Sequence, residues 1–271
     1  MLDKELSSAT KPPLKLEDFH HPTFSEVDAC GDDDNLPTAH LLNDDCLDMI
    51  LSYFDLVELI QLSSVCRRWY NLCIYKISCS NYFSTETFKN YNDDTQQRDR
   101  SPAPASLEAV MSVLSLTHRN LESLSLSAVV GLNAEILSTI GDLLPNLKEL
   151  EFCFELKLDE SLFRIIGERF VTNLECLMLQ SWHADNIKCK WLLKDARNLR
   201  FLNITGYNDD DNPNQLCLTD FISTDNPLMC IRFQRFTHLH PDSMTFIFKN
   251  FAATLEYIDL SYTNLQGLAS S

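Results

Sequence analysis

Between residues 44 and 72, apolar residues recur at helical spacing in three short runs. The first run predicts a helix whose apolar face, at i, i+3, i+4 and i+7, consists of Leu47, Ile50, Leu51 and Phe54. The second run follows Asp55, which has Glu58 three residues later in the spacing of a helix-capping box. The third has Arg67 and Arg68 facing water and its apolar positions at Val65, Cys66, Trp69 and Leu72. Three helices this short cannot bury all of their apolar surface against one another. We therefore expect part of that apolar surface to face a second polypeptide.

After a polar stretch, the chain changes to a longer period. Six phrases begin at residues 120, 146, 173, 198, 227 and 254: NLESLSLS, NLKELEFC, NLECLMLQ, NLRFLNIT, PLMCIRFQ and TLEYIDLS. Their leading leucines follow one another at intervals of 26, 27, 25, 29 and 27 residues, and each phrase continues with the alternation of a strand. We interpret CIYKISC, residues 73–79, as an earlier copy.

Helical spacing returns between these phrases. The predicted helices are LNAEILSTIGDLL, LDESLFRIIGERF, ADNIKCKWLLKDA and HPDSMTFIFKNFA, with caps at or near Asn133, Asp159, Asp185 and Asp242. The longest unit contains GYNDDDNPNQ, interpreted as a solvated loop, and leaves only the stub LTDFIST for its helix. One strand and one helix per unit of this length is typical of leucine-rich repeats, which share a core only when stacked.

These patterns predict an α/β protein in which a short three-helix module precedes a solenoid. Parallel strands are expected on the concave face of that solenoid and helices on its convex face. We divide the chain into a disordered acidic tail at 1–40, the helical module at 41–73 and the repeats at 74–271, with a loop at about 84–105. The last phrase ends close to residue 271, which leaves its strand as an open edge, so we expect either that the chain is a truncated form or that a partner covers this end.

Charge and cysteine usage limit the kinds of partner and the cellular compartment that we expect for this protein. A net charge of −17 argues against binding to nucleic acid or to an anionic membrane surface. The ten cysteines occur singly, which favours a reducing compartment. The sequence also contains no apolar run for export or membrane insertion. We therefore expect a cytoplasmic or nuclear protein. His20, His21 and Cys30 lack the paired spacing of a metal site.

Motifs for catalysis or cofactor binding are missing from the sequence. It has no phosphate loop, dinucleotide fingerprint, HExxH or GxSxG, so we expect neither a cofactor nor catalysis. Cys153, Cys176 and Cys230 fall within the strand phrases, where packing or recognition explains them.

The helical module resembles the F-box. The order Leu42-Asn43-Asp44, Ile50-Leu51-Ser52-Tyr53, Asp55, Leu59, Leu62 and Val65-Cys66-Arg67-Arg68-Trp69 is similar to the family's L-P-x-E, I-L-x-x-L and V-C-[KR]-x-W. Asn43 stands where the family usually has proline, at the edge that meets a Skp-type adaptor. The resemblance implies an adaptor-binding set comprising Leu42, Asn43, Leu47, Ile50, Leu51, Leu59, Val65, Cys66 and Trp69, some of which must be internal packing.

An F-box followed by leucine-rich repeats resembles the FBXL-type substrate receptors of SCF ubiquitin ligases. The resemblance implies that the F-box binds a Skp-type adaptor and through it a cullin, while the repeats bind a target protein for ubiquitination and proteasomal degradation. The alternative is a leucine-rich-repeat interaction scaffold that recruits no ligase. Strand positions between the leucines point away from the core, and the target-binding candidates among them are Glu151, Met178, Phe201, Asn203, Arg232, Tyr257 and Asp259. Each candidate also fits an ordinary surface residue.

Overall fold

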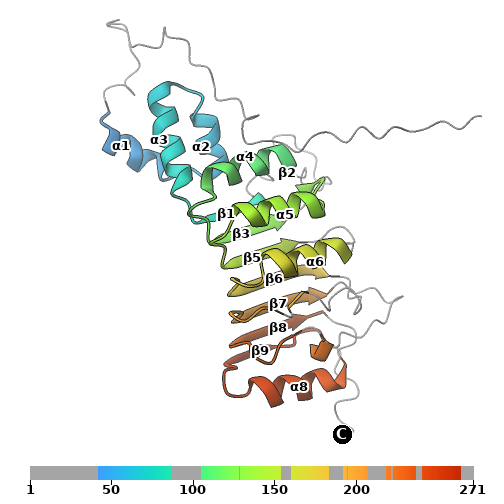
Figure 1. The fold of residues 1–271 in the computed structure, drawn as a ribbon. Helices are drawn as coiled ribbons and strands as arrows, with labels where there is room; N and C mark the ends of the chain where they lie inside the picture. The colour runs from blue at the N-terminus through green and yellow to red at the C-terminus, as the bar shows by residue number, and fades with distance from the viewer. Residues whose placement is uncertain are drawn as a thin grey trace, which may run out of the picture.

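A computed structural model describes residues 42–86, 105–127, 129–153, 160–182, 192–193, 195–206, 218–220, 222–235 and 240–263. Three helices at the start of this range lie at one end of a column of strands (Figure 1). The predicted acidic tail, its metal candidates, most of the predicted loop at 84–105 and most of GYNDDDNPNQ lie outside the described residues.

The first three helices form where the apolar runs predict them. They are α1 (Asp44–Leu51), α2 (Leu56–Leu62) and α3 (Arg67–Ser78). The capping box of α2 is confirmed, because Asp55 Oδ1 accepts hydrogen bonds from the backbone N–H groups of Val57 and Glu58, both at 2.9 Å. Glu58 Oε2 accepts the reciprocal bond from the Asp55 N–H at 2.9 Å. These bonds satisfy N–H groups that the first turn of α2 leaves without intrahelical partners.

The interpretation of residues 73–79 as a strand is wrong. These residues continue α3, and the first strand of the sheet is β1 (Tyr82–Ser84). Cys73 and Ile77 are fully buried one helical turn apart, in the same cluster as Leu51 and Leu59. The helical face therefore had partners to pack against, and this packing outweighs the strand-like alternation of the segment.

The repeated phrases contain the strands of one parallel sheet. Its order is β1-β3-β5-β6-β7-β8-β9. The strands after β1 are β3 (Ser123–Ser127), β5 (Glu149–Cys153), β6 (Cys176–Trp182), β7 (Phe201–Gly206), β8 (Cys230–Gln234) and β9 (Tyr257–Asp259). Equivalent residues of successive phrases pair directly, as in Leu124↔Leu150 and Leu150↔Leu177. A second, two-stranded sheet joins β2 (Ala105–Ser106) to β4 (Val129–Val130).

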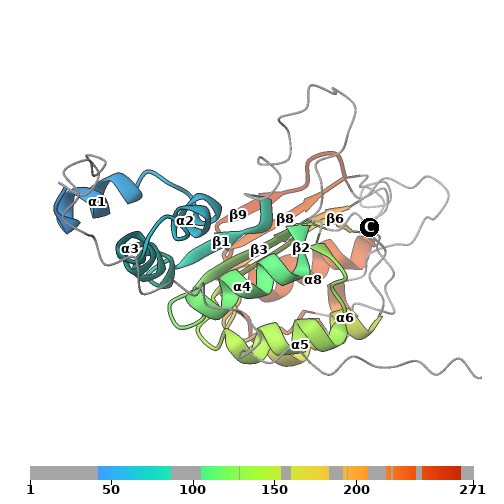
Figure 2. The same cartoon turned by 90° about the horizontal axis from the view of Figure 1, so that it is seen from above.

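Helices cover one face of the large sheet (Figure 2). They are α4 (Leu107–Thr117), α5 (Ala134–Leu143), α6 (Glu160–Arg169) and α8 (Pro241–Phe251), and the predicted stub is the short 3-10 helix η5 (Leu218–Asp220). Asn133 caps α5 as predicted. The cap of α8 is His240, whose Nδ1 accepts from the Asp242 N–H at 3.2 Å. Helix α4 was not among the predicted helices, and residues 184–191 and 194 of the third predicted helix lie outside the described residues.

The core lies between the sheet and these helices. Inward strand residues form rows across the sheet, and the first row, Leu124, Leu150, Leu177, Leu202 and Ile231, has at most 1% of each residue exposed. Phe152 and Phe233 belong to the second row and are equally buried. Because full burial of one such side chain contributes about 1.5–3 kcal/mol, each repeat is stabilised chiefly by its neighbours.

Asparagines at the start of the phrases join each repeat to the previous one. The Nδ2 groups of Asn146, Asn173 and Asn198 donate to the backbone carbonyls of Arg119, Pro145 and Thr172, at 3.1, 3.1 and 2.8 Å. Asn120 donates in the same way to the carbonyl of Ser78 at 2.7 Å, which attaches the end of α3 to the sheet. The recurrence of Asn before Leu was visible in the sequence, but its hydrogen-bonding role required the stacked geometry.

The buried second row predicts a large cost for Phe152→Ala. Removing this ring leaves a cavity, so we expect the free energy of unfolding to fall by about 3–5 kcal/mol. Urea denaturation followed by circular dichroism measures the loss. The matched control is Phe248→Ala on α8, where the residue is 55% exposed, and its change should stay within about 0.5 kcal/mol. Equal losses in the two variants would contradict the assigned core.

Candidate functional site

The three-helix module separates the predicted adaptor-binding residues into two groups. Leu47, Leu51 and Leu59 are 1%, 0% and 4% exposed, so they pack inside the protein. Trp69 is half-buried and packs against the cluster that contains Leu51 and Leu59. Leu47, Leu51 and Leu59 are therefore not available as surface contacts in this conformation, whereas Trp69 keeps part of its surface exposed.

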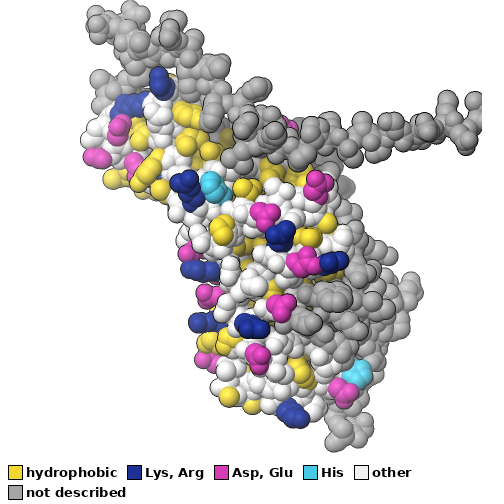
Figure 3. Space-filling model, viewed as in Figure 1, with side chains coloured by type: hydrophobic (Ala, Val, Ile, Leu, Met, Phe, Trp, Pro, Cys, Tyr) yellow, Lys and Arg dark blue, Asp and Glu magenta, His cyan; other side chains and the backbone are white. Residues whose placement is uncertain are grey.

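Other apolar side chains of the module face solvent. Ile50 and Val65 from the predicted set are 39% and 61% exposed, and Met49 and Tyr53, which the predicted set lacks, are 65% and 84% exposed. We call Met49, Ile50, Tyr53 and Val65 the exposed apolar set. Figure 3 shows hydrophobic side chains on the surface of this module. Met49 and Tyr53 were omitted because neither belongs to the predicted apolar face of the first helix, which consists of Leu47, Ile50, Leu51 and Phe54.

Asn43 and Leu42 anchor the start of α1. Asn43 Oδ1 accepts from the Cys46 N–H at 2.8 Å, so the residue in the usual place of proline caps the helix. Arg68, which we expected to face water, instead pairs with Asp44 at 2.7 Å and donates to the Leu42 carbonyl at 2.5 Å. Its long side chain reaches back to α1 because α1 and α3 are in contact. Lys76 and Asp48 form a second link between these helices at 2.8 Å.

The helical module is continuous with the sheet. Leu56 and Ile60 of α2 pack against both hydrophobic clusters, and Leu116 of α4 packs against the cluster of the module. Apolar contact of this kind resists relative movement of the two parts, because separation would expose the shared side chains to water.

The strand register brings the predicted target-binding residues together. We define the open face as the face of the large sheet opposite α4, α5, α6 and α8 (Figure 2). Direct pairing places five candidates in one row across this face: Glu151, Met178, Asn203, Arg232 and Asp259. Phe201 and Tyr257 lie in the adjacent row, on either side of Cys230. Phe201 and Tyr257 are 44% and 47% exposed, so both rings present apolar surface.

Several candidates already have partners within the chain. The Arg232 guanidinium lies 5.3 Å from the centre of the Tyr257 ring, in a cation–π contact. Asp259 accepts from the side chain and backbone N–H of Ser261 and from Gln234 Nε2, and these bonds lower the pKa of its carboxyl. Glu151 accepts a hydrogen bond from Gln180 Nε2. Asp259 is therefore less available to a ligand than its position predicts.

The row also contains a polar atom without a partner. Asn203 Oδ1 is shielded from solvent and accepts no hydrogen bond within the described part of the chain. Such an acceptor carries a desolvation cost of about 1–3 kcal/mol. Its neighbours in the row, Met178 and Arg232, are both target-binding candidates.

A hollow lies at the β1 end of the open face and was not predicted. It has a volume of about 430 Å³ and is lined mainly by residues of β1, β3 and β5, among them Tyr82, Ser123, Ser125, Glu149 and Glu151. Tyr82 was missed because the first strand was assigned to residues 73–79. Glu149 was recognisable from the alternation of its strand, since it pairs with Ser123 and Cys176 at an outward position.

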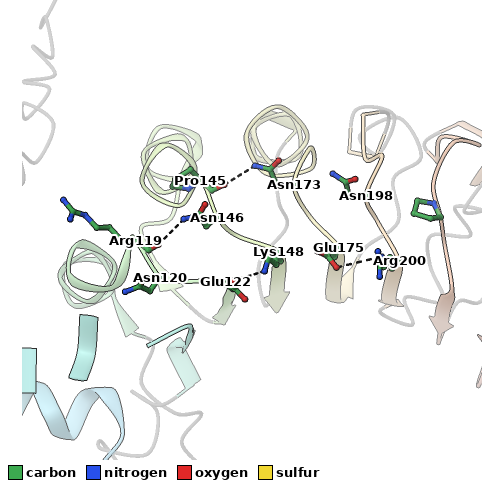
Figure 4. Close-up of a pocket in the computed structure, with 11 residues that line it drawn as sticks. Arg119, Asn120, Glu122, Pro145, Asn146, Lys148, Asn173, Glu175, Asn198 and Arg200 are labelled. Atoms are coloured by element: carbon green, nitrogen blue, oxygen red, sulfur yellow. Dashed lines mark hydrogen bonds and ion pairs between the residues drawn. The ribbon is translucent and has the colours of Figure 1, made fainter. Parts of the chain in front are cut away.

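A second and larger groove, of about 750 Å³, follows the edge where the strands begin (Figure 4). Its charged side chains alternate in sign and pair across strands, with 2.8 Å between Lys148 Nζ and Glu122 Oε1 and 4.0 Å between Arg200 Nε and Glu175 Oε2. The hydrogen bond from Lys148 to Glu122 raises the pKa of Lys148. Because these charges pair with one another and the asparagine amides bind backbone carbonyls, the groove has a structural role.

Burial makes two of the strand cysteines poor nucleophiles. Desolvation raises the pKa of Cys176 to about 12 and also raises the pKa of Cys230. A reactive cysteine requires the opposite shift, toward the thiolate at neutral pH. Among the residues that the structure describes, no group of three or more His, Cys, Asp or Glu side chains is arranged to hold a metal ion. The described helices include none with the length and apolar character needed to cross a membrane.

The helical module matches a known protein family. The family model of the F-box domain matches residues 40–80, which include α1, α2 and α3. A comparison of the chain with curated proteins finds no match. Residues 40–80 are thus an F-box domain, which indicates an adaptor-binding subunit of an SCF-type ubiquitin ligase.

Proposed function

We propose that the protein is a non-catalytic substrate receptor of an SCF-type ubiquitin ligase. The F-box domain binds a Skp-type adaptor and through it a cullin, and the sheet binds a target protein that is then ubiquitinated and degraded. The observation that supports this most directly is the match of the F-box domain to residues 40–80, which expose five large apolar side chains, the exposed apolar set and Tyr75. A protein with this role acts in the cytoplasm or the nucleus.

We also propose that the chain after the F-box domain, residues 81–271, forms a leucine-rich-repeat solenoid. Three features support this assignment: parallel strands recurring every 25 to 29 residues, leading leucines of which the first five are buried and Leu255 is partly buried, and helices on one face of the sheet. Adjacent repeats of a solenoid share one core, and their equivalent outward residues form an extended binding surface.

The adaptor contact is assigned to the exposed apolar set with Leu42, Asn43, Cys66 and Trp69 at its margins. The cores of protein interfaces are rich in aromatic and other apolar side chains that monomeric surfaces seldom group together. Met49, Ile50 and Tyr53 all belong to α1 or to the turn that follows it. Leu47, Leu51 and Leu59 support this surface from inside the module.

The target contact is assigned to the open face. Phe201 and Tyr257 supply exposed aromatic surface, Arg232 is held over the Tyr257 ring, and Met178 is half-buried between them and the hollow. Aromatic and arginine side chains held in fixed positions are typical anchors of protein interfaces.

One observation favours an interaction scaffold without a ligase. Leu56 and Ile60 of α2 pack against the sheet core, as they would if the F-box helices only capped the first repeat. Capture of the adaptor distinguishes the two functions, because a cap alone requires no adaptor.

The receptor function predicts that Ile50→Asp combined with Val65→Asp abolishes adaptor capture. Both residues are exposed, so a charge at each position disrupts the interface and leaves the fold intact. We expect adaptor retention to fall at least about tenfold, as for the loss of an interface hot spot. Co-purification of a tagged full-length chain with a Skp-type adaptor measures it.

The matched control is Phe248→Asp, an equally polar change at an exposed residue of α8. Figure 1 places α8 at the opposite end of the sheet from α1, α2 and α3, so adaptor retention should match wild type. Failure of the wild-type chain to retain any adaptor would support the scaffold instead.

The assigned target surface predicts that Phe201→Ala combined with Tyr257→Ala depletes the proteins that the chain retains from cells. Truncating both exposed rings removes the apolar anchors of the open face, with an expected loss of at least about tenfold for the specific partners. Quantitative mass spectrometry of proteins bound to the full-length chain measures the change, with Phe248→Ala as the control. An unchanged set of bound proteins would contradict the assignment of the target site to β7 and β9.

A further inference from the structure

The hollow at the β1 end of the open face has the shape of a slot for one side chain. Ser123 and Ser125 of β3 form its floor, with Tyr82 of β1 on one side and the two glutamates of β5 on the other. Serine is shorter than its neighbours in the rows, which creates the depression. Because adjacent strands lie about 4.8 Å apart, the backbones on either side of the slot are separated by about 10 Å.

The charges around this slot are predominantly negative and partly unpaired. Glu149 and Glu151 form no ion pair with Lys or Arg in the described ranges. Lys148 lines the hollow too, but its ammonium group is bound to Glu122 at 2.8 Å. Glu151 accepts one hydrogen bond, from Gln180 Nε2, so Glu149 and the remaining acceptor positions of Glu151 are available to a cation from outside the chain.

Ser125 provides a second and independent indication of a ligand. The residue is only 5% exposed, yet its hydroxyl forms no hydrogen bond with any other described residue, and it lines the hollow. The hydroxyl is not among the side-chain atoms that are fully shielded from solvent, so its remaining exposure is to the water that fills the hollow. A donor group that enters the slot would supply a hydrogen-bond partner.

We propose that the hollow receives an arginine side chain of the target protein, a specificity that rests on the receptor function proposed above. The guanidinium group has five N–H donors, enough for Glu149, Glu151 and the Ser125 hydroxyl together. Tyr82, which is 52% exposed, supplies an aromatic surface on which guanidinium stacks, and Met178 borders the alkyl stem. The recognised segment is basic, which matches the acidic charge of the receptor.

The test measures binding at the hollow itself. The full-length protein is labelled with ¹³C in its methionine methyl groups, and the Met178 signal is assigned by its loss in Met178→Leu. The probes are two short glycine–serine peptides, one with a central arginine and one with the uncharged isostere citrulline. We expect the arginine peptide to shift the Met178 signal saturably and to bind at least about tenfold more tightly than the citrulline peptide.

Glu149→Gln combined with Glu151→Gln should remove this preference for arginine, and Ser125→Ala should weaken arginine binding several-fold. The control Glu135→Gln, at an exposed residue of α5, should leave it unchanged. Raising the salt concentration should weaken binding, since the contact is between charges near solvent. Equal shifts with the two peptides, or a preference that persists without the two carboxylates, would overturn the proposal.

Adaptor capture by the same preparations separates this inference from the function on which it rests. If the protein captures the adaptor but does not prefer the arginine peptide, only the arginine site is overturned. If the protein binds the arginine peptide but captures no adaptor, the receptor function is overturned. The hollow then remains a site for a basic segment on an interaction scaffold.

Discussion

Backbone pairing between parallel strands in matched register determines most of the architecture. Because Leu150 lies beside Leu124 and Leu177, every inward residue of one repeat covers the inward residue of the next. The same register collects the outward residues into rows on the open face and brings each asparagine amide within reach of a carbonyl in the previous repeat. A single repeat has none of these contacts, so the packing of the core and the grouping of outward residues both depend on the stack.

The F-box helices obey a related constraint. Their interior holds few side chains, and two of the residues that complete it, Leu56 and Ile60, also contact the sheet. The module thus gains stability from the repeats while Met49, Ile50 and Tyr53 remain in solvent. The F-box module therefore packs against the sheet on one side and exposes apolar surface on the other. This arrangement suits a module that connects the sheet to a second polypeptide.

Electrostatics divides the sheet into regions with different chemistry. Along the edge where the strands begin, Glu122 pairs with Lys148 and Glu175 with Arg200, so these charges largely compensate one another. On the open face, Glu149 and Glu151 place two carboxylates on β5, whereas Arg232 and the exposed rings of Phe201 and Tyr257 lie toward β9, where Asp259 is bound by Ser261 and Gln234. A partner that spans this face meets an acidic region near β1 and a region with a cation and two aromatic rings toward β9. That polarity favours one orientation of the partner over the reverse.

The sequence by itself determined the three helices, the capping box at Asp55, six of the seven strands in the large sheet and which of their residues point outward. Local periodicity and capping chemistry carry this information, because both depend on neighbours within a few residues. Only the tertiary structure decided that residues 73–79 are helical, that Arg68 binds α1 and that Leu51 is internal while Ile50 is exposed. It also created the slot above Ser125, since Tyr82 and Glu149 come together only when three separate strands pair. Contacts between distant segments depend on packing and register across the whole fold, which no local pattern encodes.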